Sequence, residues 1–283
     1  MWRTPILISY AYRRGVDWDL IKAEASAGRF ILIDCGAFTA FRCGKKIDFN
    51  EWLSWVKEVR VMIPSAHILA LDEIGDAVKT RENFKRIIAA GISVIPIFTR
   101  GSSVEHLQFY MQHSSYIALG GLREGGKNNL GYAKWFHRIV NEQSTGTHVH
   151  WLGFHHSDAV RYFKPYSLDL SSFARASRFG ILDFWDGRCF KCYRRPTITS
   201  DELNFIISRV HTIYKIDVCK LKSRQGWYGG NSTVSILSAL SWVRFARDTF
   251  DRVGTRICAA ITSSRFLVDR IIYSEQLLSE RSI

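Results

Sequence analysis

The chain has 283 residues, of which 47% are hydrophobic and 13% aromatic, and its formal net charge is +13. This composition supplies a sizeable core, and it excludes a wholly disordered chain or a small domain that depends on disulfide bonds. The positive charge favours a polyanionic partner such as a nucleic acid. A basic surface without a specific partner is the alternative.

The six cysteines are dispersed along a chain that is long enough to fold without disulfides. No apolar run approaches the ~18 residues of a membrane-spanning helix. The apolar stretch at the start ends in Arg13 and Arg14 and is too short for a secretory signal. We therefore expect a cytoplasmic protein with no membrane partner.

Short apolar runs typical of strands recur along the chain, and segments with helical spacing separate them. The expected strands are 5–10, 30–34, 67–72, 93–98, 116–121, 148–154, 166–170 and 180–185. Between two of them, Trp52, Trp55, Val56 and Val59 form one apolar helical face. Near-continuous apolar strands that alternate with amphipathic helices predict a parallel sheet covered by helices. The pattern favours a (β/α)8 TIM barrel, with an open doubly wound sheet as the alternative.

The pattern changes after residue 185. The segment "WDGRCFKCYRRP" is typical of a loop, and two helical patterns follow at 200–215 and 232–250. We predict a TIM-barrel catalytic core over 1–185. Residues 186–283 are expected to form a C-terminal helical appendage that completes or caps the barrel within a single domain.

Three acids lie at the ends of expected strands: Asp34, Asp72 and Asp169. In a barrel the carboxyl ends of the strands converge on one face, where the chemistry of such folds takes place. Two carboxylates in one pocket can divide their roles between nucleophile and proton carrier, and a third can bind a polar ligand. The alternative is that each acid is a helix cap or a turn former.

Glycines give a second indication of a ligand site. Gly120 and Gly121 directly follow an expected strand, where the missing Cβ atoms let the backbone approach a flat ligand. Gly36 and Ala37 leave room beside Asp34. No GxGxxG opens a helix and no Walker motif is present, which argues against a nucleotide-phosphate loop. An ordinary strand-to-helix turn is the alternative for each glycine motif.

These motifs, taken in order over residues ~30–185, resemble the guanine transglycosylases, which exchange guanine for a 7-deazaguanine base. "DCGAF" (34–38) resembles the family's Asp-Ser-Gly-Gly-Phe, and "LDE" (71–73) resembles its Phe-Asp-Glu. "LGGL" (119–122) matches its Gly-Gly-Leu loop. Asp169 falls on the nucleophile, and Arg175, Arg178 and Gly180 then match the family's Arg-x-x-Arg-x-Gly.

The resemblance implies a role for each matched residue. Asp169 would attack C1′ of a guanosine-type nucleotide to form a glycosyl ester, and Asp34 would be the general acid/base. Arg175 and Arg178 would bind flanking phosphates. The residues expected to bind the base are Asp72, Cys35, Gly120, Gly121, Leu122 and Phe38. Phe38, Phe98 or Phe154 could stack on the base, although aromatics on barrel strands are more often core.

The sequence departs from the family in three places. Phe98 and Thr99 stand where members often have a Gln, and Cys35 replaces a Ser. The family's structural zinc site is represented only by Cys189 and Cys192, which are half of a tetrahedral set. His211 and Cys219 are the further candidates for that set. No cofactor is otherwise required.

The resemblance is closest to the viral, phage-type branch that places 7-deazaguanines in DNA. DNA is therefore the expected partner, with a 7-deazaguanine base as second substrate and tRNA as the alternative polymer. Two other classes stay open. One is a nucleoside hydrolase that uses the same acids, and the other is a non-catalytic nucleic-acid-binding barrel.

Overall fold

The computed structural model describes residues 2–122, 129–143, 146–154, 156–170, 179–214, 218–229, 232–261 and 265–280. The chain divides into two compact units. The sheet unit consists of Pro5–Leu170 and Val253–Ser263, and the helical unit consists of Met1–Thr4, Ser171–Arg252 and Ser264–Ile283. The chain therefore leaves the first unit after residue 170 and returns to it at residue 253, whereas the sequence predicted one change of pattern at residue 185.

The sheet unit contains eight strands, with helices between them. Its elements are β1 (Ile6–Ser9), η1 (Tyr10–Gly15), α1 (Trp18–Ser26), β2 (Ile31–Asp34), α2 (Ala37–Arg42), α3 (Phe49–Met62), β3 (His67–Ile68), α4 (Ala77–Ala89), β4 (Ile97–Phe98), α5 (Val104–His113), β5 (Tyr116–Leu119), α6 (Asn129–Gln143), β6 (His148–Trp151), α7 (Ser157–Phe163), β7 (Ser167–Leu170) and β10 (Arg256–Ile261). The first seven predicted strands are confirmed, with shorter bounds.

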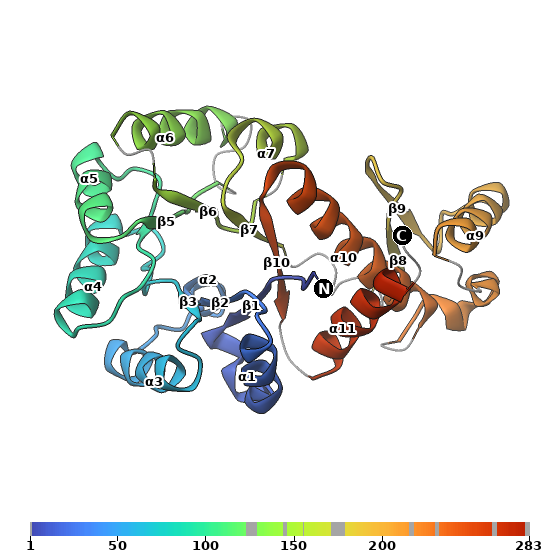
Figure 1. Cartoon of the computed structure of the whole chain (residues 1–283), viewed down its shortest axis with the longest axis horizontal. Coiled ribbons are helices and arrows are strands. Elements are labelled where there is room, and N and C mark those ends of the chain that lie inside the picture. The colour runs from blue at the N-terminus through green and yellow to red at the C-terminus, as the bar shows by residue number, and fades with distance from the viewer. Residues whose placement is uncertain are drawn as a thin grey trace. The chain divides into compact units, whose positions relative to one another are not determined.

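All strand pairs of this sheet are parallel, and the strand order is β3-β2-β1-β10-β7-β6-β5-β4. The sheet curls, and α1 and α3 to α7 lie outside its strands (Figure 1). Among the described residues, the end strands β3 and β4 meet only in an isolated bridge between Leu69 and Ile95. The chain thus forms a curled eight-stranded parallel sheet flanked by helices, consistent with a TIM-like fold, without a continuous ladder around it.

The predicted eighth strand, 180–185, does form, but it does not belong to the parallel sheet. Residues Ile181–Trp185 form β8, which pairs antiparallel with β9 (Phe190–Arg194) in a two-stranded hairpin of the helical unit. All five residues of β8 are buried, so its apolar run could not be told from that of a buried parallel strand. The eighth strand of the large sheet is β10, which the sequence analysis missed, and it lies between β7 and β1.

The helical unit follows the hairpin with helices and short turns. These are α9 (Ser200–Tyr214), η4 (Cys219–Lys222), η5 (Arg224–Gly226), α10 (Thr233–Val253) and α11 (Arg265–Glu280). The two helical patterns of the sequence correspond to α9 and α10. Inside the unit, the Trp185 indole N–H donates to the Asp248 carboxylate at 2.7 Å, which ties the hairpin to α10. In the described part of the chain, no helix is both long and apolar enough to cross a bilayer.

The acids that cap helices in the sheet unit are separate from the three acids at the strand ends. Asp17, Asp48 and Asp76 are the N-caps of α1, α3 and α4, and each accepts a backbone N–H of its own first turn. The N-cap of α2 is Gly36, whose φ is +80°. Asp34 itself ends β2 and precedes that cap.

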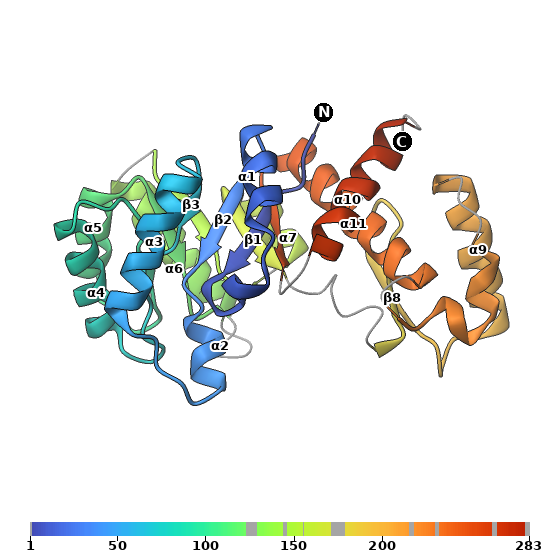
Figure 2. The same cartoon turned by 90° about the horizontal axis from the view of Figure 1, so that it is seen from below.

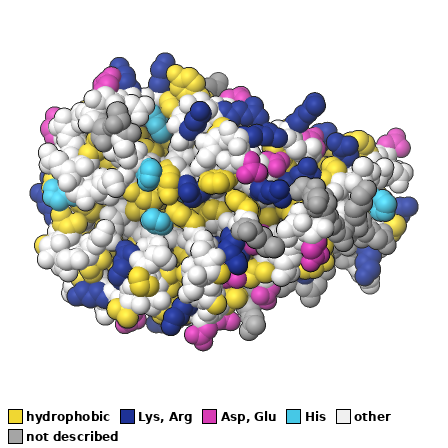
Figure 3. All heavy atoms as spheres, in the orientation of Figure 1, with side chains coloured by type: hydrophobic (Ala, Val, Ile, Leu, Met, Phe, Trp, Pro, Cys, Tyr) yellow, Lys and Arg dark blue, Asp and Glu magenta, His cyan; other side chains and the backbone are white. Residues whose placement is uncertain are grey.

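The amino ends of the strands are covered by a group of rings, which we call the aromatic cluster. It consists of Phe30, His67, Tyr116, His148, Tyr166 and the guanidinium of Arg256. His148 stacks on Tyr166 with ring centres 3.8 Å apart, and the Arg256 guanidinium lies 4.3 Å from the centre of the Tyr166 ring. Figure 3 shows histidine side chains (cyan) set among hydrophobic ones (yellow) on the viewed face of the sheet unit.

Candidate active site

Asp34 ends β2 and is held by neighbouring backbone and hydroxyl groups. The Gly36 N–H donates to Asp34 Oδ2 at 3.0 Å, and the Ser9 hydroxyl from the adjacent strand β1 also hydrogen-bonds the carboxylate. Burial and the nearby Asp169 carboxylate raise the pKa of Asp34, and the bonds from Ser9 and Gly36 oppose this rise. A carboxyl with a raised pKa is suited to exchange a proton near neutral pH.

Asp169 lies in β7 and keeps part of its side chain exposed. The Gly153 N–H donates to Asp169 Oδ1 at 2.7 Å, and Nε2 of His150 lies 3.3 Å from the same oxygen. The Asp169 side chain is 16% exposed, whereas the His150 side chain is 0% exposed. Among the described residues, no group donates a hydrogen bond to Oδ2 of Asp169. One oxygen is therefore fixed, and the other is left to react or to bind a ligand.

The three strand-end acids are brought together, and we call them the acid cluster. The Asp169 charge acts on Asp34. The Cys35 thiol is buried, and its pKa is raised well above the usual range by that burial and by the charges of Asp34 and Asp72. Cys35 is therefore a buried, protonated thiol close enough to feel both charges. Because β2, β3 and β7 are parallel, their carboxyl ends point to the same side of the sheet.

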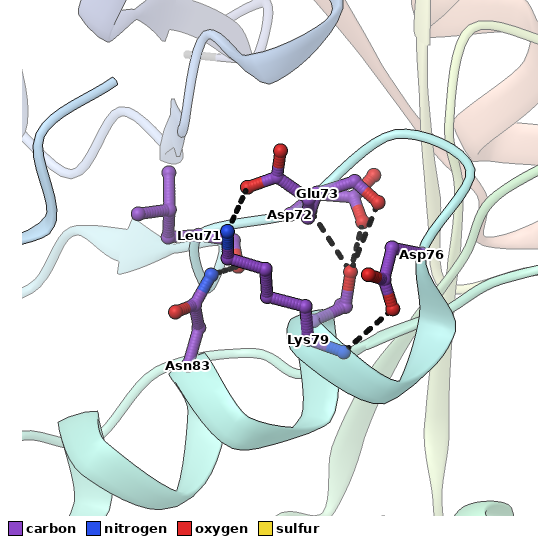
Figure 4. A network of polar contacts seen from close by, with 7 residues as sticks. Leu71, Asp72, Glu73, Asp76, Lys79 and Asn83 are labelled. Carbon is purple, nitrogen blue, oxygen red and sulfur yellow. Dashed lines mark hydrogen bonds and ion pairs between the residues drawn. The ribbon is translucent and has the colours of Figure 1, made fainter. Parts of the chain in front are cut away.

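Asp72 also has a structural role, because it helps to hold the start of α4 (Figure 4). The hydroxyl of Thr80 donates to Asp72 Oδ1 at 2.7 Å, and the Glu73 N–H donates to the same hydroxyl at 2.9 Å. The Asn83 amide donates to the Leu71 carbonyl at 3.3 Å. These bonds fix the turn after β3, so Asp72 combines a turn-forming contact with its place in the acid cluster.

The glycine loop after β5 requires a glycine at position 121. Gly121 has φ +71°, and a Cβ there would lie 2.8 Å from the Cβ of Arg100. The Arg100 guanidinium donates to the Gly121 carbonyl at 3.2 Å and to Asn129 Oδ1 at 3.1 Å. These bonds link the loop to the first residue of α6. Gly120 bonds the Phe98 carbonyl through its N–H, and Leu122 is fully buried. The loop is thus a rigid turn at the carboxyl ends of β4 and β5.

The predicted aromatic residues lie in different surroundings. Phe98 is fully buried and packs on Phe136 with ring centres 5.4 Å apart, so it belongs to the core. Phe154 lies next to the Trp151 ring. Phe38 lies on α2 and is 51% exposed, which leaves its ring free to stack on a ligand.

Two groups that bond Asp169, His150 and Gly153, were missed in the sequence, and so was Ser167, which bonds His150. The available signal was the alternation of β6 and β7, since His150 on β6 and Ser167 on β7 are paired in register, and Asp169 shares a face with Ser167. Without knowledge of which strands are neighbours, that register could not be assigned.

Two predicted groups cannot be placed in the acid cluster. Arg175 and Arg178 lie outside the described residues. Cys189 and Cys192 belong to the hairpin of the helical unit, where the thiol of Cys189 contacts Asp186 at 3.7 Å. No group of three or more His, Cys, Asp or Glu side chains that could hold a metal ion occurs in the part of the chain that the structure describes. The described residues therefore do not form a complete zinc site.

The acid cluster can support covalent or acid–base chemistry on a polar ligand, and the glycine loop lies at the same carboxyl-end side of the parallel sheet. Comparison with known proteins adds no assignment to this geometry, because no protein-family model and no curated protein sequence matches the chain.

Proposed function

We propose that this protein is a base-exchanging transglycosylase that replaces guanine in a nucleic acid, DNA first, by a 7-deazaguanine base. The sheet unit would be a (β/α)8 barrel whose eighth strand is β10, with the acid cluster at its carboxyl-end mouth. The proposal is carried by two interacting carboxylates in different environments. Asp34 is held by donors and has a raised pKa, whereas Asp169 presents an oxygen that no described group binds.

The chemistry proceeds in two displacements. Asp169 attacks C1′ of the target nucleotide, the C1′–N9 bond breaks, and Asp34 in its acid form protonates the departing guanine. The Asp34 carboxylate then takes the proton from the ring nitrogen of the incoming base. That nitrogen attacks C1′, and the bond between C1′ and Asp169 breaks. Two inversions give net retention, and both carboxyl groups return to their starting states.

A surface beside the acid cluster supports a polymeric substrate. We call it the α2 patch. Its exposed or partly exposed side chains are Tyr12, Arg14, Phe38, Phe41, Arg42, Lys45 and Lys46. Phe41 is 60% exposed, and the Arg42 guanidinium lies 6.0 Å from the centre of the Phe38 ring. α2 begins just after Asp34 and lies beyond the end of β2 (Figure 2). No acidic residue occurs between Asp34 and Asp48.

Exposed aromatic rings interleaved with cations are the composition of surfaces that bind unpaired nucleotides. A buried base in a duplex is out of reach of a carboxylate, so the target nucleotide must be flipped out or already single-stranded. The α2 patch and the net charge of +13 favour a transglycosylase that acts on a nucleic acid over a hydrolase that acts on a small, neutral nucleoside. A nucleoside needs no cationic track.

The test is exchange of radiolabelled guanine into three polymers in parallel: duplex DNA, single-stranded DNA and tRNA. We expect incorporation into DNA, highest with single-stranded DNA. Incorporation into tRNA alone would assign the alternative substrate. Release of free guanine from nucleosides, with no incorporation into any polymer, would contradict the transglycosylase and support a hydrolase.

Salt dependence provides an independent check. Binding through phosphates weakens steeply as the salt concentration rises, because neutralised phosphates release counterions. Affinity for the polymer that does not change with salt would argue against a nucleic-acid substrate.

A further inference from the structure

A chain of hydrogen bonds runs through the sheet unit from its amino-end face to Asp169. The Tyr116 hydroxyl lies 2.5 Å from the Ser167 hydroxyl, and that hydroxyl lies 2.5 Å from Nδ1 of His150. On the other side of the same ring, Nε2 lies 3.3 Å from Asp169 Oδ1. The chain joins β5, β6 and β7, and His150 and Ser167 are 0% exposed.

The direction of the protons in this chain follows from its two ends. Burial raises the pKa of Tyr116 far above its usual range, so the phenol keeps its proton and donates it to Ser167. Ser167 has a single hydroxyl proton and uses it toward Nδ1 of His150. Nδ1 is then an acceptor, and the ring proton is on Nε2, facing Asp169 Oδ1, an oxygen that also accepts the Gly153 N–H.

We infer that His150 is the positioning residue of the nucleophile: Ser167 and Tyr116 fix its Nε2–H tautomer, and that N–H, with the Gly153 N–H, locks Asp169 Oδ1 so that Oδ2 attacks. This inference rests on the proposed function for its last step. It adds to that proposal which oxygen forms the ester and which side chain aims it.

The ordinary alternative is a buried histidine that only satisfies the core. His137 is such a residue in the same unit. Its Nε2 accepts the Trp151 indole N–H at 3.0 Å, and burial lowers its pKa to about 4. Among the described residues, His137 makes no hydrogen bond to any of the acids, whereas both ring nitrogens of His150 are engaged, one of them with Asp169. The pair thus offers a matched comparison of two buried histidines.

The first measurement needs no substrate. Two-dimensional ¹⁵N NMR of the full chain, with His150 assigned from the His150→Gln variant, reports which ring nitrogen carries the proton. We expect a protonated Nε2 and an unprotonated Nδ1, and we expect Ser167→Ala to remove that preference. A protonated Nδ1 in the wild-type protein would overturn the assignment.

The second measurement is the single-turnover rate at which glycosyl–enzyme forms. We expect His150→Leu to reduce this rate by ~100-fold with little change in KM for the polymer, because Asp169 Oδ1 loses one of its hydrogen-bond donors. His150→Gln, whose amide can still donate to Oδ1, should recover most of the rate. His137→Leu should lose stability but keep the rate.

The outcomes of these measurements distinguish a failure of the role assigned to His150 from a failure of the proposed transglycosylase function. An active wild-type protein whose His150→Leu variant reacts as fast as His137→Leu would overturn the role of His150 alone. A wild-type protein with no glycosyl–enzyme and no base exchange would end both proposals. The NMR result would then describe only a structural tautomer.

Discussion

The two ends of the curled sheet use polar residues in opposite ways. At the amino ends of the strands, the aromatic cluster stacks His148 on Tyr166 and closes the sheet with rings and the Arg256 guanidinium. At the carboxyl ends, the pKa of the partly buried Asp34 is raised, and one oxygen of Asp169 has no donor among the described residues. The first arrangement stabilises the fold, and the second accepts a cost in stability to hold carboxylates close together.

The two ends are joined by Tyr116. Its ring packs edge-on against His67, His148 and Tyr166 in the aromatic cluster, and its hydroxyl begins the chain that reaches Asp169. A residue of the stabilising end therefore orients a residue of the reactive end. Changes at each end should have separate effects, except along this chain.

The largest effect is expected from Asp169→Asn. The amide cannot form the glycosyl ester, so base exchange should fall by at least ~1,000-fold while the thermal unfolding midpoint changes little. The matched control is Asp158→Asn, an exposed acid on α7 that lies 3.7 Å from the Arg161 guanidinium. Exchange activity retained by Asp169→Asn would show that Asp169 is not the nucleophile.

At the opposite end, Tyr166→Ala should lower stability and leave chemistry intact. Loss of the stack on His148 and of the Arg256 contact should reduce the free energy of unfolding by about 2 kcal/mol. The exchange rate per folded molecule should stay the same. Tyr162→Ala, whose ring is 74% exposed on α7, is the control and should change stability by less than ~0.5 kcal/mol. Equal effects of the two substitutions would contradict a stabilising role for the aromatic cluster.

Most substitutions lower the stability of a protein. Asp34→Asn should instead raise the free energy of unfolding at neutral pH. The folded-state pKa of Asp34 is raised above its unfolded value, chiefly by burial, so its contribution favours folding at low pH and is lost as the pH rises through the folded pKa. The variant should therefore be more stable than the wild type at pH 7, and the difference should shrink as the pH falls toward ~4. Denaturant titrations at several pH values measure this. A variant that is less stable at pH 7 would refute the buried-charge account.

The smallest effect is expected at the α2 patch. Phe41→Ala should weaken binding of single-stranded DNA by about 1 kcal/mol through the loss of one stacked base. Lys45→Ala with Lys46→Ala should reduce the slope of log affinity against log salt by roughly 1.4, for two phosphate contacts. The control is Val61→Ala, an exposed side chain on α3. Unchanged binding in all of these variants would show that the polymer does not bind the α2 patch.

The sequence predicted most of the sheet, because seven strands have near-continuous apolar runs such as "FILID", and three of these runs have an acid at or next to their last residue. It failed at the eighth strand, because "GILDFW" and "RICAAI" are both short apolar runs, and only their partners distinguish a hairpin from a parallel strand. Local pattern carries no information on an insertion of Ser171–Arg252 between two strands that become neighbours.

The candidate site was predictable to a similar extent. Asp34, Asp72 and Asp169 could be found because each ends an apolar strand. His150 could not, since its partners are set by the register of β6 with β7 and by the reach of Tyr116 from β5. Such contacts form only when the strands are assembled into the sheet, so they could not be predicted from a single sequence.

The central claim is tested most directly by trapping the protein with its substrate. The full chain is mixed with guanine-containing single-stranded DNA, without added base, quenched in acid and analysed by peptide mass spectrometry. We predict a covalent adduct in which the strand has lost one guanine and its C1′ is bound to the side chain of Asp169. An adduct on another residue, or no adduct under conditions in which labelled guanine is exchanged, would contradict this mechanism.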